Sequence, residues 1–455
     1  MKKIKRRSAA ALLLVLFLAL GVVVYIIKLC TKGSSWVSAP FNTHVYSDGV
    51  LRMGSILDRN GVVLSGTTND GHRYYNDDWT TRVSTLHAVG DIAGNIGSGA
   101  LTAQADKLMG YDIINGVYSV GGKGNDLYLT IDSELNRVAY NALNGRKGAV
   151  AVYNYETGEV LCMVSTPAFD PNDPGGFDSE SSRYSGVYMN RFLSSTFTPG
   201  SVFKLVTLSA AMDLFEDFDT RTYECRGTYD VNGDLVRCTG NHGIIDIPTA
   251  LAESCNCVFA QMSLDLGGEV IQQYAEKYGL LDSFKVSGVI TAAGYFEVAE
   301  DGSIGLAWSG IGQFHDLVNP AAMLRFVGAI ANGGTATNPR TVKKTTTSWG
   351  LPTSICSKST DGRYMSREKA ERIAGMMRNN VVLKYGEGTF PGLDICAKSG
   401  TAEVQDGVSP HSWFVGFLRD EEHPLAFVCI VENGGGGLAV AGSITNTVLQ
   451  SAVQR

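Results

Sequence analysis

The longest uncharged apolar run of the chain covers residues 9–27, close to the N-terminus. At a rise of 1.5 Å per residue, a helix of about this length crosses the hydrocarbon core of a lipid bilayer. A basic stretch, residues 2–7, precedes the run, and no small-residue pattern typical of a signal-peptidase site follows it closely. The pattern therefore predicts an uncleaved transmembrane helix over residues 9–29 rather than a cleaved signal peptide.

The basic flank also sets the predicted orientation of this helix. Lysine and arginine next to a membrane helix favour the cytoplasmic side. We therefore expect residues 1–8 to form a cytoplasmic tail. Everything after the helix should lie on the extracellular face of the cell membrane.

Residues 30–124 are predicted to form a small β-rich module. Two strand patterns within residues 52–65 flank Asn60 and Gly61, and Asn-Gly is a strong hairpin signal. Glycines within residues 121–125 suggest a linker at the end of the module.

Residues 125–455 show apolar patterns that predict one larger domain. Strand patterns cover residues 127–130, 148–153, 160–165, 393–403, 413–418 and 425–432. Helical patterns cover residues 132–143, 201–214, 248–266 and 439–453, and Asp132 or Ser133 caps the first of these. Strands at both ends with helices between them indicate one antiparallel sheet closed by the two ends of the domain, an α+β fold.

Composition excludes several kinds of function. The net charge is −7 and no basic cluster occurs outside the N-terminus, so no nucleic-acid partner is expected. The nine cysteines include no C-x-x-C pair and no zinc-like Cys/His spacing, so we predict no metal site. Cys225 and Cys238 flank a turn-rich stretch. Outside the cell they could form a disulfide, or both could stay reduced, and the sequence does not decide between the two.

A candidate nucleophile follows the Pro199-Gly200 break, where Ser201 precedes Lys204 by three residues. On a helix these side chains share one face, and a desolvated neutral lysine can take the proton of a serine hydroxyl. Alternatively, Ser201 caps the helix and Lys204 is a surface charge. The same spacing recurs at Ser366, where we predict a helix cap.

Two further motifs change this picture, namely Ser254-Cys255-Asn256 and Lys398-Ser399-Gly400-Thr401. Taken alone, each could be structural, as a helix bend and a solvated strand. Together with Ser201 they fit one reaction. A second hydroxyl can relay a proton, a carboxamide can hold a substrate amide, and a lysine with two hydroxyls can bind a carboxylate. Gly400 lets the strand approach an acyl group and supply an oxyanion N–H.

The three motifs, in this order, resemble the active site of penicillin-binding proteins and serine β-lactamases. Other stretches resemble the same transpeptidase domain, and residues 54–61 resemble the N-terminal pedestal of class B members. These further stretches include Gly312-Gln313, Asn319-Pro320 and residues 411–417. The resemblance implies the penicillin-binding transpeptidase fold, an antiparallel sheet flanked by helices plus an all-helical subdomain, preceded by the anchor and pedestal.

The resemblance implies a role for each motif residue. Ser201 would attack the bond between two terminal D-alanines of a peptidoglycan stem peptide, and Lys204 would act as its base. Ser254 would pass the proton to the departing D-alanine, and Asn256 would hold a substrate amide. The N–H groups of Ser201 and Thr401 would form the oxyanion hole.

The remaining roles concern the strand motif and the second substrate. Lys398, Ser399 and Thr401 would bind the substrate carboxylate. The amine of a second stem peptide would then attack the ester and form a cross-link. β-Lactams would acylate Ser201 as substrate mimics, and no cofactor is implied. Cys255 is interpreted as a packing residue.

The short pedestal suggests a monofunctional class B protein, similar to the compact A-type penicillin-binding proteins of Gram-positive bacteria. The resemblance then implies a separate, polytopic glycan polymerase as partner. Other interpretations are a β-lactam-hydrolysing or sensing protein and a non-catalytic cell-wall scaffold. Between Ser254 and Lys398 the sequence has no Glu-x-x-Leu-Asn segment of the kind a β-lactamase would need. A role in division, elongation or sporulation is not distinguished.

Overall fold

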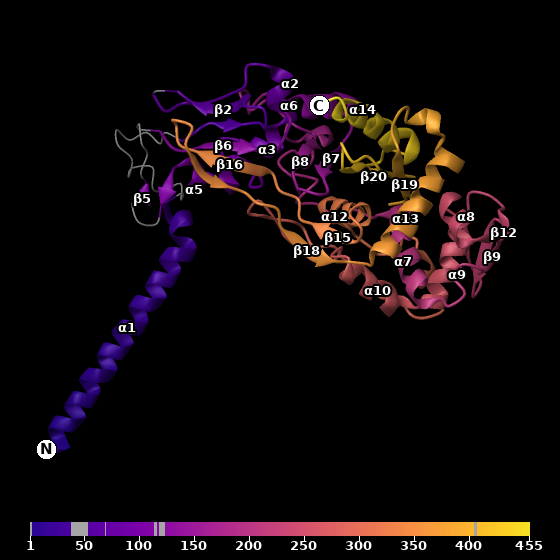
Figure 1. Cartoon of the computed structure of the whole chain (residues 1–455), viewed down its shortest axis with the longest axis horizontal. Helices are drawn as coiled ribbons and strands as arrows, with labels where there is room; N and C mark the ends of the chain where they lie inside the picture. The colour runs from indigo at the N-terminus through magenta and orange to yellow at the C-terminus, as the bar shows by residue number, and fades with distance from the viewer. Residues whose placement is uncertain (1, 38–52, 69, 113–115, 118–122, 405–406) are drawn as a thin grey trace.

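The computed structural model describes residues 2–37, 53–68, 70–112, 116–117, 123–404 and 407–455. Helix α1 (Lys2–Val37) projects away from the rest of the molecule (Figure 1). Within the described ranges it is the one helix long and apolar enough to cross a membrane. The helix predicted over residues 9–29 lies inside it, which fits a single-pass membrane anchor.

A five-stranded antiparallel sheet in the order β19-β20-β21-β7-β8 forms the centre of the main domain. Its strands are β7 (Gly148–Asn154), β8 (Val160–Thr166), β19 (Ile395–Ala402), β20 (His411–Leu418) and β21 (Leu425–Val431). The C-terminal strand β21 pairs with β7, with Val431 opposite Gly148. The prediction that both ends of the domain close one antiparallel sheet is therefore confirmed.

Helices cover both faces of this sheet. On one face α6 (Ser133–Leu143) and α14 (Ser443–Ala452) pack against alternate side chains of the strands, and Asp132 caps α6 by accepting the N–H of Leu135. On the other face lies α12 (Pro320–Ala331), which is buried along almost its whole length. With both faces covered, every residue of β21 is buried, which explains its unbroken apolar sequence.

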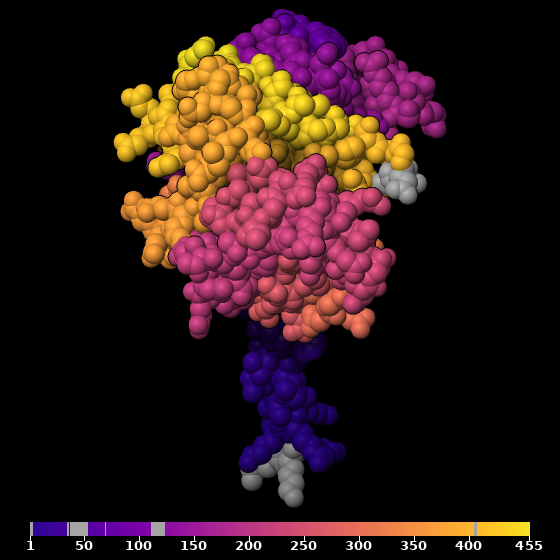
Figure 2. All heavy atoms as spheres, turned by 90° about the vertical axis from the view of Figure 1, so that its right-hand side faces the viewer, coloured from indigo at the N-terminus to yellow at the C-terminus, as the bar shows by residue number. Residues whose placement is uncertain are grey.

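A mainly helical lobe stands at the β19 end of the domain, at the right of Figure 1 and facing the viewer in Figure 2. Its helices are α7 (Lys204–Leu214), α8 (Ile247–Ala252), α9 (Asn256–Leu266), α10 (Gly268–Lys277), α11 (Ile304–Ser309) and α13 (Arg367–Asn380). The helix predicted over residues 248–266 is wrong as one element. It breaks at Ser254, whose φ of +51° is left-handed and ends α8.

The lobe also carries short hairpins that the helical prediction missed. Strand β9 (Thr222–Cys225) pairs with β12 (Gly243–Asp246), and β10 (Thr228–Val231) pairs with β11 (Asp234–Arg237). A further pair, β13 (Lys285–Val286) with β14 (Val289–Ile290), lies outside the lobe, since Ser287 in its turn accepts from Gln104 and from the Thr341 N–H.

A second sheet, in the order β17-β16-β6-β1-β2-β3, lies at the upper left of Figure 1, on the side of the molecule from which α1 projects. Its strands are β1 (Ile56–Leu57), β2 (Val63–Thr67), β3 (Arg73–Tyr75), β6 (Asp126–Leu129), β16 (Val342–Thr346) and β17 (Pro352–Ile355). The predicted hairpin is confirmed, since β1 and β2 pair antiparallel and Gly61 has a φ of +89°.

Strands from both sides of the predicted boundary at residue 124 share this second sheet, because β1 pairs with β6 in parallel. The boundary itself stays a prediction, and the linker predicted at residues 121–125 lies partly outside the described residues. The remaining elements are α2 (Trp79–Ser84), α3 (Leu86–Val89), α4 (Ala100–Ala103), α5 (Ala105–Leu108), β4 (Tyr111–Asp112), β5 (Gly116–Val117), β15 (Thr335–Thr337) and β18 (Thr360–Arg363).

Candidate active site

Ser201 lies in a single 3₁₀ turn (Gly200–Val202) that leads into α7, and its side chain is half-buried. Gly200 has a φ of +55°, and a Cβ there would lie 2.9 Å from the Cβ of Ala402. The Gly200 N–H donates to the Gly312 carbonyl at 2.8 Å. The turn is therefore held between β19 and the Gly312 loop. It does not cap α7, since the N-cap position belongs to Phe203.

Lys204, the first residue of α7, is fully buried. Its Nζ donates to the Ser254 carbonyl at 2.6 Å, to Asn256 Oδ1 at 2.8 Å and to Ser254 Oγ at 3.2 Å. Burial disfavours the charged amine and lowers the pKa of Lys204 to about 7. A substantial fraction of the amine is therefore neutral near physiological pH, as a general base requires.

The break between α8 and α9 creates the contacts of Ser254. In a continuous helix its carbonyl would accept a backbone N–H one turn later. With a φ of +51° the chain turns instead, and Cys255 is extended before α9 begins at Asn256. The carbonyl and hydroxyl of Ser254 then both face Lys204, which the helical pattern of the sequence could not show.

Lys398 bonds to the same hydroxyl. It lies on β19, is fully buried, and its Nζ donates to Ser254 Oγ and to the Ser399 carbonyl, both at 2.9 Å. Burial holds the pKa of Lys398 well below its usual value, and the charge of Lys204 lowers this pKa further. Ser254 Oγ thus connects two buried amines, an arrangement suited to moving a proton between them.

Strand β19 is an edge strand, and its free edge faces the nucleophile turn. The Ser399 N–H donates to Tyr385 Oη at 2.8 Å and so points away from β20. The backbone N–H groups of a strand point alternately to its two edges, so the N–H of Thr401, two residues later, points to the same free edge. A Cβ at Gly400 would lie 3.1 Å from the Pro199 carbonyl and 3.0 Å from Val202 Cγ1, so the strand and the turn pack closely.

This geometry brings together every residue that the three motifs predicted. They are Ser201, Lys204, Ser254, Asn256, Lys398, Ser399, Gly400 and Thr401. The amide of Asn256 has partners at both ends, since Nδ2 donates to the Arg237 carbonyl at 3.0 Å. The Thr401 hydroxyl is exposed and accepts the Gly437 N–H at 3.2 Å, which leaves its own hydrogen free to donate.

Sequence reasoning missed three residues that position this site. Tyr385 bonds to both the N–H and the hydroxyl of Ser399, the latter at 3.0 Å. Trp413 Nε1 donates to the Thr198 carbonyl at 3.0 Å and fixes the segment before the nucleophile. Gly437 lies against β19, where a Cβ would be 2.4 Å from the Gly400 carbonyl. The run of glycines at residues 434–437 was a signal for such a close approach.

The second serine–lysine pair has a structural role. Ser366 is the N-cap of α13, where its hydroxyl accepts the Lys369 N–H at 3.2 Å. Lys369 Nζ pairs with Asp213 at 2.7 Å. The prediction of a helix cap is confirmed.

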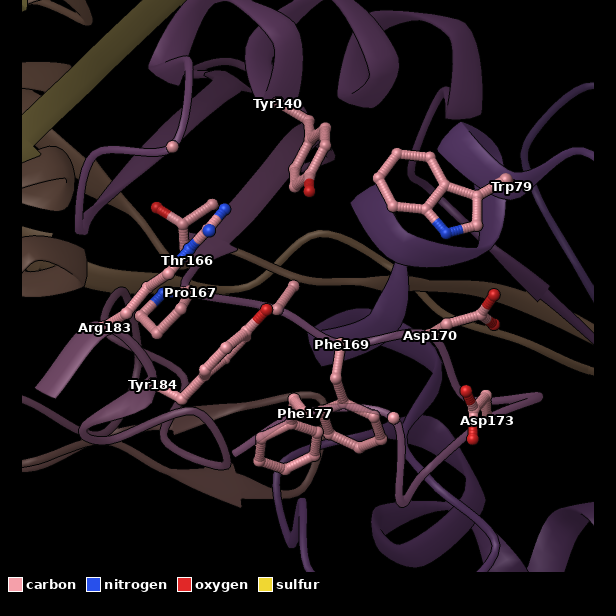
Figure 3. A pocket seen from close by; sticks show the side chains of 13 residues that line it. Trp79, Tyr140, Thr166, Pro167, Phe169, Asp170, Asp173, Phe177, Arg183 and Tyr184 are labelled. Carbon is pink, nitrogen blue, oxygen red and sulfur yellow. The ribbon is translucent and has the colours of Figure 1, made fainter. Parts of the chain in front are cut away.

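Of the hollows on the described surface, one lies apart from the motif residues and another borders the end of β19. A cavity of about 310 Å³ beside α2 and α6 is lined by aromatic side chains, including Trp79, Tyr140 and Phe177 (Figure 3). It contains none of the motif residues. A groove of about 550 Å³ extends from the Thr401 end of β19, between Gln313 and Glu403. Its position suits the approach of an extended substrate to Ser201.

The fold and the three motifs define a penicillin-binding transpeptidase, and comparison with known proteins agrees. The family described as the penicillin binding protein transpeptidase domain matches residues 148–450, and the chain belongs to this family. The peptidoglycan D,D-transpeptidase PbpA of Mycobacterium tuberculosis is 26% identical over 365 residues, which cover 73% of each chain. Stage V sporulation protein D of Bacillus subtilis is 27% identical, over 73% of this chain and 53% of its own length.

Solved structures show the same architecture. Penicillin-binding protein A of M. tuberculosis, as a ceftriaxone acyl-enzyme complex, superimposes with a TM-score of 0.78 at 22% identity. That match covers 89% of this chain and 98% of the other. The D,D-transpeptidase domain of a peptidoglycan glycosyltransferase from Eggerthella lenta gives a TM-score of 0.76 at 27% identity, with the same coverage. The predicted fold and the predicted family are confirmed.

Proposed function

We propose that this protein is a membrane-anchored, serine-type peptidoglycan D,D-transpeptidase that works through an acyl-enzyme on Ser201. The observation that carries the proposal is the buried amine of Lys204, one helical turn after Ser201 and bonded to Ser254 and Asn256. Relatives named peptidoglycan D,D-transpeptidase, and β-lactam acyl-enzymes among similar structures, support the same activity.

Acylation begins with proton transfer from Ser201 to the neutral amine of Lys204. The Ser201 oxygen attacks the carbonyl between the two terminal D-alanines, and a tetrahedral oxyanion forms. The N–H groups of Ser201 and Thr401, on the nucleophile turn and the free edge of β19, stabilise that charge. As the C–N bond breaks, Ser254 passes a proton from Lys204 to the departing amine of D-alanine.

The second half of the reaction reverses these steps. The amine of another stem peptide attacks the ester, and its proton passes through Ser254 to Lys204. Lys204 returns a proton to the Ser201 oxygen as the ester C–O bond breaks. The result is a peptide cross-link. Lys398 and the hydroxyls of Ser399 and Thr401 hold the substrate carboxylate in this proposal.

Asn256 would bind a substrate amide by exchanging one of its present partners, Lys204 or the Arg237 carbonyl. β-Lactams would enter as mimics of the D-alanyl-D-alanine end and remain as esters on Ser201.

The site is placed outside the cell in this proposal. The basic residues before the apolar part of α1 favour a cytoplasmic N-terminus, and the donor peptides of the reaction lie on the outer face of the membrane. Because the proposed activity forms peptide bonds only, a separate glycan polymerase must supply the strands. The proposed partner is a polytopic membrane protein, which α1 would contact within the membrane.

The deciding experiment uses the full-length protein in detergent with a fluorescent penicillin and with a stem peptide plus a labelled D-amino acid. We expect a stable covalent adduct and exchange of the terminal D-alanine for the label. Ser201→Ala should abolish both, and labelling of that variant would contradict the nucleophile assignment. Rapid turnover of penicillin without exchange would instead indicate a hydrolase, and no labelling of the wild type would indicate a scaffold.

A further inference from the structure

Four potential metal ligands meet directly behind the Ser254 motif. The sulfur atoms of Cys225, Cys238 and Cys255 and a ring nitrogen of His242 all lie within 4.8 Å of one another. Cys225 ends β9, Cys238 follows β11, His242 precedes β12, and Cys255 lies in the break between α8 and α9. Segments that are separate in the sequence therefore converge on one point.

Three of the six distances between ligand atoms in this cluster match a tetrahedral zinc centre, and the other three are within 4.8 Å. With Zn–S near 2.3 Å and Zn–N near 2.05 Å, tetrahedral geometry separates two sulfurs by about 3.8 Å and a sulfur from a nitrogen by about 3.6 Å. The Cys238 and Cys255 sulfurs are 3.7 Å apart. His242 Nδ1 lies 3.4 Å from the Cys225 sulfur and 3.6 Å from that of Cys238.

A disulfide does not fit the same contact. Sulfur atoms in a disulfide are about 2.05 Å apart, much closer than the 3.7 Å between the Cys238 and Cys255 sulfurs. The Cys257 thiol also contacts the Cys238 and Cys255 thiols, from the first turn of α9. Three thiols and an imidazole form instead a Cys₃His set, one of the ligand sets of structural zinc sites. Cys225 and Cys255 are buried, while Cys238 and His242 are half-buried.

The other ring nitrogen of His242 supplies an independent indication. His242 Nε2 lies 3.5 Å from the Glu253 carboxylate, so the ring can donate to Glu253 while Nδ1 faces the sulfurs. Metal-binding histidines are usually oriented by such a carboxylate partner. Glu253 also pairs with Lys384 at 2.5 Å.

We propose that Cys225, Cys238, His242 and Cys255 bind one Zn²⁺ ion in a closed structural site. Binding forms three Zn–S bonds and one Zn–N bond, and the three thiols release their protons to solvent. Four protein ligands complete the tetrahedron, so the metal carries no substrate and takes no part in the chemistry. The sequence prediction of no metal site rested on local spacing, whereas these ligands are assembled by two hairpins and a helix break.

The metal positions the proton relay. Cys255 stands between Ser254 and Asn256, and both of these residues accept from Lys204. Cys238 follows Arg237, whose carbonyl accepts from Asn256. Fixing Cys255 and Cys238 to one ion therefore fixes the helix break on which Lys204 depends. The proposed effect of the metal on acylation rests on the proposed function. The proposed binding of zinc does not.

The test measures metal directly in the full-length protein purified from zinc-supplemented cells. We expect about one zinc per chain by mass spectrometry of the metal, retained after exposure to a weak chelator. Cys238→Ser and Cys255→Ser should each lose most of it. Cys356→Ser, at a half-buried cysteine outside the cluster, should keep it.

Cobalt substitution provides a readout that does not depend on activity. The wild type should show thiolate-to-cobalt charge-transfer absorption, reduced in Cys238→Ser, and circular dichroism should confirm that each variant is folded. The proposal is overturned if the wild type binds no stoichiometric zinc, if Cys238→Ser binds as much as the wild type, or if non-reducing mass mapping finds a Cys225–Cys238 disulfide. Ser201→Ala should keep its zinc while losing penicillin labelling, which separates this proposal from the proposed function.

Discussion

Lys204 and Lys398, both fully buried, direct their amines to the same hydroxyl, that of Ser254, at 3.2 and 2.9 Å. Two ammonium groups this close would repel each other in a medium that screens charge poorly. Burial lowers both pKa values, and for Lys398 the neighbouring lysine adds to the effect. Both shifts favour a neutral amine beside Ser254, whose hydroxyl can pass a proton from one amine to the other.

The first prediction concerns the pH dependence of acylation. The pKa of Lys204 is lowered to about 7, so its neutral, proton-accepting form is lost as the pH falls through that value. The second-order rate constant for β-lactam acylation should fall about tenfold per pH unit below 7 and level off above it. Stopped-flow measurement with a chromogenic cephalosporin checks this. A profile that stays flat down to pH 5 would contradict the role of Lys204 as base.

Lys204→Arg tests the same assignment without removing the positive charge. A guanidinium stays protonated at every pH of the assay, so it cannot accept the Ser201 proton. We expect acylation to slow by more than about 100-fold, within the range for loss of a general base. Thermal unfolding of the variant is the control for folding. Near-wild-type labelling of a folded variant would assign the base to another group.

Ser254→Ala should separate proton relay from binding. The variant removes the hydroxyl between the two amines but keeps the backbone carbonyl that accepts from Lys204 at 2.6 Å. We expect a loss of about 10²–10⁴ in the acylation rate, with little change in the initial binding of the β-lactam. Pre-steady-state kinetics resolve the two steps. A change confined to binding would mean that Ser254 only shapes the pocket.

Ser366→Ala provides the matched test for the second serine–lysine pair. Its hydroxyl caps α13, so the variant should lose about 1 kcal/mol of stability. Penicillin labelling should be unchanged, because neither Ser366 nor Lys369 belongs to the three motifs. Chemical unfolding and gel labelling measure the two quantities. A large loss of labelling with little change in stability would refute the structural assignment.

The contrast between these serines shows what the sequence could and could not supply. Order along the chain distinguished Ser201 from Ser366, because only Ser201 is followed by a relay motif and a carboxylate-binding strand. The sheet that β7 and β21 close was also predictable from apolar strands at both ends of the domain. The break at Ser254 was not, since helix-forming residues flank it and only tertiary contacts compensate for its left-handed φ.

Partners distant in the sequence account for the rest of what was missed. Tyr385 ends a short π-helical turn (Val381–Tyr385) with no motif around it, yet it bonds to Ser399. The ligands of the proposed zinc site come from short strand pairs within residues 222–246, where the sequence predicted a turn-rich stretch, and from the break at Cys255. Local patterns report local structure, and these contacts depend on how distant segments pack.

Tyr385→Phe tests how the carboxylate pocket is held in shape. Tyr385 Oη accepts the Ser399 N–H and has its own hydrogen available for Ser399 Oγ. When Tyr385 donates in that bond, the hydrogen of Ser399 is free for a substrate carboxylate. Without the phenol hydroxyl, Ser399 loses this orientation. We expect initial binding of D-alanyl substrates and β-lactams to weaken about tenfold, with acylation of the bound ligand nearly unchanged. Single-turnover kinetics give the binding constant and the acylation rate constant separately. An effect on the acylation rate alone would mean that Tyr385 positions the oxyanion hole and not the carboxylate pocket.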